Sequence, residues 1–331
     1  MDVRQLTYFL AVVDHGGFTR AAEQLLIAQP SLSQTIKGLE RELGVPLFHR
    51  IGRRVVLSEA GEELVGPARV VVRDLEAARS AVDDLRGVRS GRLDVVAMPS
   101  PGVEPLTSMI AAYARAHPAV TVSVDAAFTP EEVADAVRTG RAEIGVLGSE
   151  HPFRSAEVEV MHLEQQPLVL IVAPQADTFG DGHAIRREDL AGHRVVVSQQ
   201  GSLMRRLVDD ALAGGVPVEI AAEVAHRTSV LPLVLAGVGH AVLPSSWTPL
   251  AHAAGLRVLR IEPVTVLHVA VLSRPAHLTP AARAFLAVAA EHAARHAADR
   301  SRAPEGTAPD RAERAGRPEG TAPQDAPRIV S

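Results

Sequence analysis

Side chains that form hydrogen bonds or carry positive charge are concentrated between residues 19 and 57 of this 331-residue chain. Gln and Ser can bond to the edges of bases in the DNA major groove, whereas Arg and Lys neutralise phosphates. The candidates are Thr19, Gln29, Pro30, Ser31, Ser33, Gln34 and Lys37 on two helices, and Arg50, Arg53 and Arg54 on a hairpin that follows them. These residue types predict binding to double-stranded DNA.

Three helices and the hairpin must position these side chains. Apolar residues at helical spacing predict each helix. Gly16-Gly17 ends the first helix, Thr19 is the predicted N-cap of the second, Pro30 opens the third and Gly44 ends it. The predicted inward-facing residues are Leu6, Phe9, Leu10 and Val13, then Ala21, Ala22 and Leu25, then Leu32, Ile36, Leu39 and Leu43. With a tight turn at Gly52-Arg53-Arg54, this order is that of a winged helix-turn-helix.

The polar residues have a simpler interpretation when they are taken singly, because Ser, Gln and Arg are common on any solvated helix face. Their combination with helix-turn-helix spacing favours DNA binding instead. The formal net charge is −5, so bulk charge does not attract the chain to nucleic acid. A local basic surface must do so.

Short motifs follow one another along the first 61 residues. They are Phe9-Leu10-Ala11-Val12-Val13, Ala21-Ala22-Glu23-Gln24-Leu25, Gln29-Pro30-Ser31-Leu32-Ser33, Ile36-Lys37-Gly38-Leu39-Glu40, Leu43-Gly44, Leu47-Phe48-His49-Arg50 and Arg53-Arg54-Val55-Val56-Leu57-Ser58-Glu59-Ala60-Gly61. In these motifs the chain resembles the LysR-type transcriptional regulators. Where the family usually has Ser or Thr, this chain has Ala28, so one helix cap or phosphate contact is expected to be missing.

Residues 58–90 are predicted to form a long linker helix and a hinge. From Leu64 onward, apolar residues recur at the alternating spacing of four and three that marks a heptad seam. The seam residues are Leu64, Ala68, Val71, Leu75, Ala78, Val82 and Leu85, and Gly66-Pro67 is expected to bend the helix or to end a first segment. Such a stripe could pack on its own domain, but it favours dimerisation, the role of this segment in the resembled family. A two-fold dimer predicts a pseudo-palindromic operator.

After residue 90 the pattern changes to alternating strands and helices. The predicted strands lie at 93–97, 120–124, 144–147, 168–172, 194–197 and 267–272, and the predicted helices lie near 104–117, 130–139, 202–213, 228–236 and 279–296. Continuous Val, Leu and Ile runs separated by helices predict mostly parallel sheets that are covered on both faces.

This second region is similar to the effector domain of the same family, which is built like a periplasmic solute-binding protein. The similarity is weaker here and is carried by 140–145, Gly201-Ser202 and 237–244, with Glu143 where the family commonly has Asp. It implies an effector-binding domain at 91–297, with subdomain I at 92–166 and 267–296 and subdomain II at 167–266. The predicted fold class is therefore α+β and multi-domain: a winged helix-turn-helix at 1–57, a linker helix at 58–90 and a two-subdomain α/β domain.

Ligands of open α/β sheets bind beyond the carboxyl ends of the strands, where helix N-termini offer free N–H groups. The loops that meet this criterion supply Ser100, Pro101, Gly148, Gln200, Ser202 and Thr228. Hydroxyl and N–H donors suit a small anion, which Arg205 or Arg227 could neutralise. Ser100, Ser202 and Thr228 could equally be N-caps, and the two roles are compatible.

Several function classes find no support. The chain has no cysteine, no nucleotide-binding loop and no catalytic motif, so neither an enzyme nor a cofactor is predicted. His292 and His296 are four residues apart and could chelate a metal, but they are interpreted as solvated residues near a helix end, and no metal site is predicted. The N-terminus lacks a signal-peptide pattern and no apolar run is long enough for a membrane span, so a cytoplasmic protein without membrane contact is expected.

The tail at 298–331 is rich in Ala, Pro, Gly, Glu and Arg and is predicted to be disordered, with no function assigned. The prediction for the whole chain is a homo-oligomeric regulator, a dimer that pairs into a tetramer. Its DNA binding responds to a small-molecule effector in the C-terminal cleft, and RNA polymerase is a further candidate partner. One alternative is a solute-binding or enzymatic α/β domain whose N-terminal helices only dimerise. Another is an architectural DNA protein without a sensor, which the large α/β region disfavours.

Overall fold

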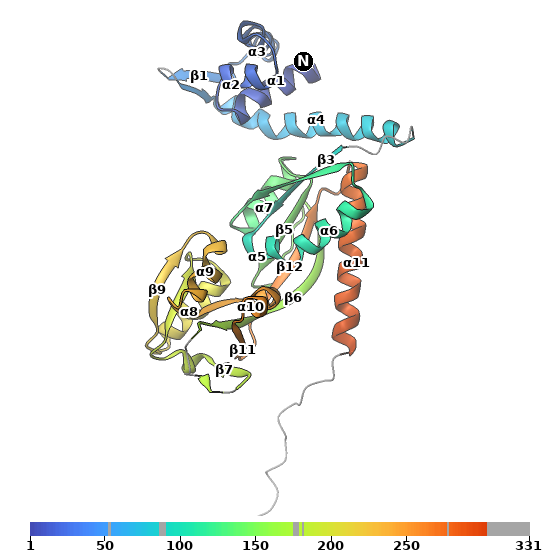
Figure 1. Ribbon diagram of the computed structural model, residues 1–331. Coiled ribbons are helices and arrows are strands. Elements are labelled where there is room, and N and C mark those ends of the chain that lie inside the picture. Colours follow the sequence, from blue (N-terminus) through green and yellow to red (C-terminus); the bar gives the residue numbers. More distant parts are fainter. Residues whose placement is uncertain (52–53, 86–90, 175–178, 181, 277, 303–331) are drawn as a thin grey trace, which may run out of the picture.

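The computed structural model describes residues 1–51, 54–85, 91–174, 179–180, 182–276 and 278–302. Within these residues, a small helical domain and a larger α/β part lie on opposite sides of one long helix, α4 (Glu59–Leu85) (Figure 1). The disordered tail predicted at 298–331 begins too early, because the last helix, α11 (Pro280–Arg302), continues through 298–302. Residues 303–331 fall outside the described residues.

Three helices form the N-terminal domain: α1 (Val3–Asp14), α2 (Phe18–Gln24) and α3 (Gln29–Leu43). The side chain of Asp2 accepts a hydrogen bond from the Gln5 N–H at 2.8 Å, and the Gln5 side chain accepts one from the Asp2 N–H at 2.7 Å. This capping box fixes the start of α1. The core shared by the helices consists of Leu6, Phe9, Leu10, Val12, Ala21, Ala22, Leu32, Ile36 and Leu39.

Two predictions for this domain are wrong. The N-cap of α2 is Gly17, and Thr19 lies inside the helix with an exposed side chain. Gly17 has a φ of +149°, a conformation that glycine tolerates best, so the backbone turn starts α2 without a capping hydroxyl. Leu43 is 39% exposed because it lies in the last turn of α3, beside the exposed Gly44 that ends the helix as predicted.

The hairpin consists of the antiparallel strands β1 (Phe48–Ile51) and β2 (Arg54–Leu57). The ring of Phe48 lies 5.4 Å from that of Phe9 and 5.5 Å from that of Phe18, so it attaches the hairpin to the helical core. The Glu40 carboxylate of α3 accepts hydrogen bonds from the N–H groups of Leu47 at 2.9 Å and Phe48 at 3.3 Å. These contacts hold the hairpin in a fixed position relative to α3.

Helix α4 begins directly behind the hairpin. The buried Ser58 hydroxyl donates to the Pro46 carbonyl at 2.6 Å and accepts from the Gly61 N–H at 3.0 Å. A Cβ on Gly61 would stand 2.2 Å from the Leu47 carbonyl oxygen, so only glycine fits there without displacement. The first turn of α4 and the hairpin therefore form one unit.

Helix α4 runs unbroken through Pro67, so of the two effects predicted for Gly66-Pro67 the end of a first segment does not occur, while a bend stays a prediction. A proline removes one N–H donor, and the packing of α4 against α1 supports the helix around it. Ala68 is 1% exposed in the core with α1, whereas Val71 is 44% exposed and Ala78 is exposed as well. The seam thus packs on its own domain at Ala68, whereas Val71 and Ala78 are exposed and Leu75 between them is half-buried. The side chains of Val82 and Leu85 lie outside the described part of the chain.

The α/β part contains further elements, with these bounds: β3 (Gly91–Ala97), α5 (Pro99–Val103), α6 (Leu106–Ala116), β4 (Val120–Ala126), α7 (Pro130–Arg138), β5 (Ile144–Ser149), β6 (Glu159–Val172), β7 (Ala184–Arg186), η2 (Arg187–Leu190), β8 (Arg194–Ser198), α8 (Leu203–Ala213), β9 (Glu219–Val224), η3 (Arg227–Ser229), α9 (Val230–Leu235), β10 (Ala241–Pro244), η4 (Ser245–Trp247), α10 (Thr248–Ala253), β11 (Arg257–Glu262), β12 (Val266–Ser273) and α11 (Pro280–Arg302).

One eight-stranded sheet extends through this part in the order β4-β3-β5-β12-β6-β11-β7, with β10 also paired to β6. Strand β6 is common to both halves: its first half pairs with β12, and its second half pairs with β10 and β11. The prediction of mostly parallel sheets is wrong, because every described pairing of β6 and of β12 is antiparallel. These strands carry the chain between the two halves in opposite directions. Parallel pairs remain at β3–β4, β3–β5, β7–β11 and β8–β9.

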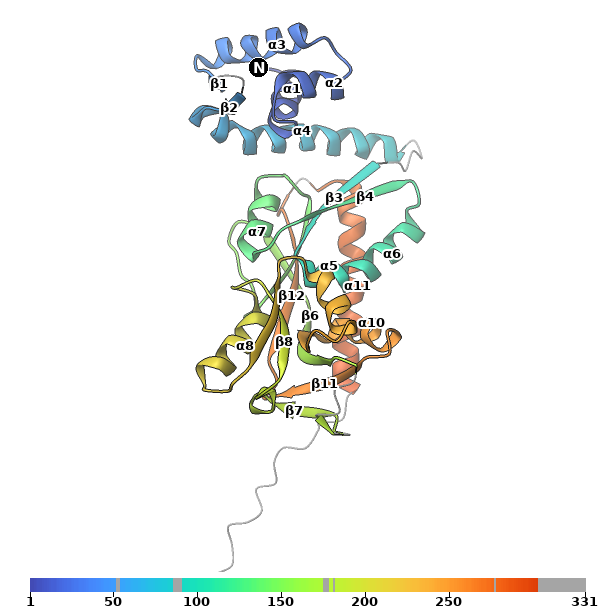
Figure 2. The ribbon, with the colours of Figure 1, turned by 60° about the vertical axis from the view of Figure 1, so that its left-hand side comes forward.

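Helices cover both faces of the sheet in the first half (Figure 2). Leu93 and Val95 of β3 belong to the same core as Tyr113 of α6 and Phe285 of α11. Val96, which points to the opposite face, belongs to a second core with Val133 of α7. The last helix therefore packs on the first half of the α/β part.

Candidate nucleic-acid interface and ligand site

The outer face of α3 carries most of the predicted DNA-binding side chains. Pro30, Ser31, Gln34 and Lys37 are exposed, and Gln29 and Ser33 are half-buried, on the side opposite the buried Leu32, Ile36 and Leu39. Ala28 is the N-cap of α3 and provides no side-chain hydrogen bond, which confirms the expected missing cap. The first turn of α3 is therefore not capped by the side chain of its N-cap residue.

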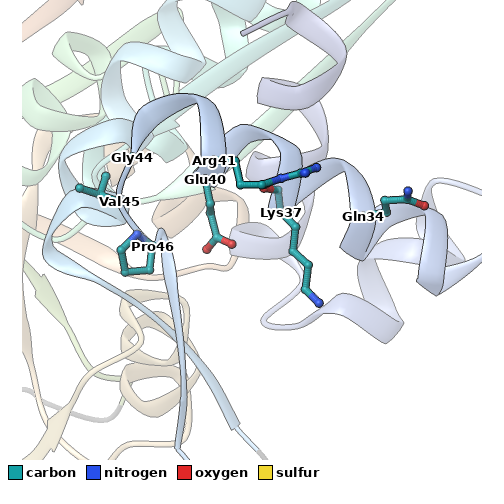
Figure 3. Close-up of a pocket in the computed structure, with 7 residues that line it drawn as sticks. All are labelled: Gln34, Lys37, Glu40, Arg41, Gly44, Val45 and Pro46. Atoms are coloured by element: carbon teal, nitrogen blue, oxygen red, sulfur yellow. The ribbon is translucent and has the colours of Figure 1, made fainter.

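A shallow depression of about 750 Å³ runs along this face. Its lining consists of Gln34, Lys37, Glu40, Arg41, Gly44, Val45 and Pro46 (Figure 3). Arg41 was absent from the sequence-predicted set, although it lies four residues after Lys37 and so shares its side of the helix. Its Nε donates to the Lys37 carbonyl at 3.3 Å. The structure therefore adds Arg41 to the side chains expected to contact DNA.

Of the three hairpin arginines, the structure describes only the backbone of Arg50 and Arg54. Arg50 pairs with Val55, and Arg54 with Ile51, in the backbone ladder of β1 and β2. Arg53 and the side chains of Arg50 and Arg54 lie outside the described residues, so their contact with DNA stays a prediction.

The α/β part is joined to α4 by ion pairs. The Arg73 guanidinium lies 3.0 Å from the Asp94 carboxylate and donates to the Arg141 carbonyl at 2.8 Å. Glu143 is buried 4.0 Å from the same guanidinium, and burial raises the pKa of its carboxyl. On the other side of α4, Arg69 pairs with Asp14 of α1. One helix thus contacts both the DNA-binding domain and the α/β part through charged groups.

The predicted effector residues come from both halves of the α/β part. Ser100 and Pro101 are buried in α5, and Gly148 is buried in β5 with its N–H 3.5 Å from the Met98 sulfur. Ser202 caps α8, accepting from the Arg205 N–H at 3.2 Å, and its hydroxyl lies 2.7 Å from that of Ser198. Gln200 and Thr228 are exposed.

Arg227 brings parts of this set together. Its Nη1 donates to the Ser100 hydroxyl at 2.5 Å and lies 3.7 Å from the sulfur of Met204, two residues after Ser202. Its Nε is buried without a hydrogen-bond partner, and burial lowers the pKa of the guanidinium to about 10. No carboxylate lies within ion-pair distance of it among the described residues. A shielded cation of this kind favours a small anion.

Arg205, the other cation considered for this role, is already neutralised. It is 6% exposed and lies 2.7 Å from Asp209 and 2.5 Å from Glu223. The sequence could not separate Arg205 from Arg227, because the distinction depends on which carboxylates the fold places beside each guanidinium.

The interpretation of His292 as a solvated residue is wrong. His292 is 7% exposed, and its Nε2 lies 2.7 Å from the Glu164 carboxylate of β6, because α11 packs across that strand. His296, one turn later, is largely accessible and lies 3.0 Å from the same carboxylate. Burial alone would raise the pKa of Glu164, but hydrogen bonds from His292 and Gln166 outweigh it and lower that pKa.

Comparison with known proteins agrees with this arrangement. A family model described as the bacterial regulatory helix-turn-helix protein, lysR family, matches residues 3–62, and one described as the LysR substrate binding domain matches residues 86–294. No helix among the described residues combines the length and the apolar character needed to cross a lipid bilayer.

Two curated relatives illustrate the similarity. A probable RuBisCO transcriptional regulator from Synechocystis is 29% identical over 265 residues, which is 78% of this chain and 76% of the relative. The RuBisCO operon transcriptional regulator of Allochromatium vinosum is 31% identical over 209 residues, 63% of this chain and 68% of the relative.

Solved structures show the same architecture over most of the chain. A full-length variant of OxyR from Pseudomonas aeruginosa has a TM-score of 0.69 at 25% identity and covers 88% of this chain and 94% of its own. Full-length CbnR in complex with its target DNA has a TM-score of 0.63 at 25% identity and covers 89% of this chain and 100% of its own.

Proposed function

Since this chain belongs to the LysR family of bacterial transcriptional regulators, we propose that a small anion bound at Arg227 controls how it binds its operator. The regulator reads DNA through its N-terminal helix-turn-helix and responds to a small-molecule effector through its C-terminal domain. The single observation that supports an anionic effector is the shielded Arg227 guanidinium, which meets Ser100 of the other half and has no carboxylate partner among the described residues.

The effector site proposed around Arg227 consists of Ser100, Pro101, Gly148, Gln200, Ser202 and Thr228. Ser100 and Arg227 belong to different halves of the domain, so an anion that takes over the guanidinium would change the contact between the halves. Such a ligand has a different affinity for each arrangement and therefore shifts the population between them. We propose that this change in population controls DNA binding.

The assembly proposed is a dimer that pairs into a tetramer and binds a pseudo-palindromic operator. Support comes from the α4 seam, where Val71 and Ala78 are exposed and Leu75 is half-buried, so that apolar side chains remain for a partner helix. We place the protein in the bacterial cytoplasm, where its DNA target lies, and RNA polymerase is a proposed further partner.

The anion proposal is tested by thermal unfolding in the presence of succinate, benzoate and phosphate, each at the same ionic strength. At least one of these probes should raise the unfolding temperature of the wild type, because binding to the native state stabilises it. Arg227→Gln should abolish that rise. Arg115→Gln, at an exposed arginine of α6, is the matched control and should keep it. An equal rise in Arg227→Gln and the wild type would contradict the site.

The DNA-binding set is tested by fluorescence anisotropy on an operator selected from genomic fragments. Gln34→Ala should weaken operator binding by about tenfold or more, because a bidentate contact to a base contributes about 1–3 kcal/mol. Arg53→Ala should weaken all sequences about equally and reduce the salt dependence, because the hairpin arginines are proposed to contact the minor groove or its flanking phosphates. Gln165→Ala, at an exposed glutamine of β6, is the control. Unchanged affinity in both variants would contradict the assignment.

A further inference from the structure

Three side chains that commonly ligate metal ions converge between β6 and α11, away from both sites described above. The ligand atoms of Glu164, His292 and His296 all lie within 4.8 Å of one another. The Glu164 carboxylate is 2.7 Å from the Nε2 of His292 and 3.0 Å from the Nε2 of His296. The two imidazole rings are 4.4 Å apart, tilted by 38°.

Local structure explains this convergence. His292 and His296 are four residues apart on α11, so their side chains emerge one above the other on the same face of the helix. That face packs on β6, which supplies Glu164. The second oxygen of Glu164 accepts a hydrogen bond from the Gln166 side chain at 2.6 Å, which orients the carboxylate from behind.

The site has both shielding and an opening. The side chains of Glu164 and His292 are 8% and 9% exposed, while that of His296 is 46% exposed. A hydrated ion can therefore approach from the His296 side and lose water as it meets the inner two ligands. An entry path, correct ligand types and a hydrogen-bonded outer partner are the features expected of a metal site.

We propose that Glu164, His292 and His296 bind a divalent transition-metal ion, with zinc as the representative of the class. Two imidazoles and one carboxylate suit zinc and its neighbours, whereas magnesium and calcium prefer oxygen ligands alone. Three protein ligands leave a fourth tetrahedral position for water or an exchangeable anion. In the metal-bound form, both Nε2 atoms are unprotonated and the ring protons lie on Nδ1.

The place of this site in the fold gives metal binding a route to the rest of the sensor. Gln166, which holds Glu164, also donates to the Glu104 carbonyl at 3.0 Å and accepts from the Ser246 hydroxyl at 2.9 Å. Ser246 belongs to η4 in the second half of the α/β part, and Glu104 to the first. A metal ion that fixes Glu164 therefore also fixes the hydrogen bonds that join the two halves.

The test is calorimetric titration of zinc chloride into the full chain, after chelator treatment and without an affinity tag. We expect one tight site per chain in the wild type. His296→Ala should weaken that site by more than about tenfold, which is the loss expected even for an outer partner of a metal ligand. His252→Ala removes an exposed helical histidine elsewhere and should leave the tight site unchanged. This control matters because the chain has 14 histidines.

A second variant keeps the proposal falsifiable if His296 contributes little. Glu164→Gln retains the size of the side chain and should also abolish the tight site, while circular dichroism reports whether the chain is still folded. Cobalt(II) added to the wild type should give a visible absorption spectrum that His296→Ala lacks. Zinc binding of equal strength in the wild type, His296→Ala and Glu164→Gln would overturn the proposal, as would no tight site in the wild type.

Discussion

Two arginines of the α/β part differ in what surrounds their charge. Arg205 is 6% exposed and paired with Asp209 and Glu223, and its hydrogen bonds to Asp209 and then to Glu223 raise its pKa. Arg227 meets a hydroxyl and a sulfur atom, and burial lowers its pKa from 12.5 to about 10. Its folded pKa is thus below its unfolded one, and the cost of burying the charge is fully present at neutral pH, below both values.

We therefore expect substitutions of these two residues to change stability in opposite directions. Arg227→Met should raise the free energy of unfolding by about 1–2 kcal/mol, since relief of the buried charge exceeds the loss of one hydrogen bond at Ser100. Arg205→Met should lower it by about 1–3 kcal/mol, because charged hydrogen bonds are lost. Urea unfolding at pH 7 measures both. Destabilisation by Arg227→Met as large as that by Arg205→Met would mean that Arg227 is a structural residue instead of a ligand residue.

At the scale of single residues, the sequence predicted which side of a helix a residue faces better than it predicted the residue's contacts with distant parts of the chain. The outward set Ser31, Gln34 and Lys37 follows from helical spacing, and the absence of a side-chain cap at Ala28 follows from its residue type. Thr19 was misplaced because a glycine pair can start a helix without a hydroxyl. The burial of His292 depends on β6, about 130 residues earlier in the chain, which no local pattern in α11 reveals.

At the scale of elements, the hairpin and the first turn of α4 behave as one unit around Gly61. A Cβ at Gly61 would meet the Leu47 carbonyl oxygen at 2.2 Å, whereas a Cβ at Gly38 of α3 would meet its nearest neighbour, the Gln5 side chain, at 3.8 Å. Gly61→Ala should lower the free energy of unfolding by about 1–3 kcal/mol or more through this overlap. Gly38→Ala should raise it by up to about 1 kcal/mol, because alanine favours the helix.

Thermal unfolding of both variants checks this prediction, and DNA affinity adds a second measurement. Gly61→Ala should also weaken DNA binding, since the displaced hairpin carries the predicted arginines. Two variants of equal stability would show that the hairpin yields freely and is not held by α4.

Strands with continuous apolar runs were the most predictable elements. The predicted β3, β4, β5, β8 and β12 are all present, with bounds within a few residues. The polar stretch Glu164-Gln165-Gln166 concealed the first half of β6, because Glu164 and Gln166 form side-chain hydrogen bonds there and Gln165 is exposed. Pairing directions were not predictable, since they depend on the order in which distant strands meet.

At the scale of the whole molecule, Arg73 connects the DNA-binding side to the sensor. It lies on α4 and contacts Asp94, the Arg141 carbonyl and, at 4.0 Å, the buried Glu143. Arg92 contacts the same Asp94 at 2.6 Å without belonging to α4. Both arginines contact Asp94, but only Arg73 connects α4 to the α/β part, so Arg92 is a matched control for Arg73.

We expect Arg73→Met to separate the unfolding of the two parts. DNA at saturating concentration should raise the unfolding temperature of the sensor in the wild type, since the contacts of Arg73 couple the DNA-binding domain to the α/β part. In Arg73→Met that rise should be lost, and the variant should be about 1–3 kcal/mol less stable because the hydrogen bonds of Arg73 to Asp94 and to the Arg141 carbonyl are removed. Arg92→Met should behave as the wild type does. Scanning calorimetry with and without DNA provides the measurement. An unchanged effect of DNA in Arg73→Met would contradict the coupling through Arg73.

Strand β6 runs from Glu159 to Val172 without a break and contributes to both halves of the α/β part. Its ladder continues past the crossing point, where the Leu168 N–H donates to the Thr265 carbonyl at 2.8 Å. Rotation of one half against the other must therefore twist β6 itself, because this strand crosses between the halves as continuous hydrogen-bonded backbone. Twisting this strand costs free energy, and that cost enters the balance between the arrangements whose populations an effector shifts. Strand β6 therefore sets part of the affinity difference that an effector must supply to control transcription.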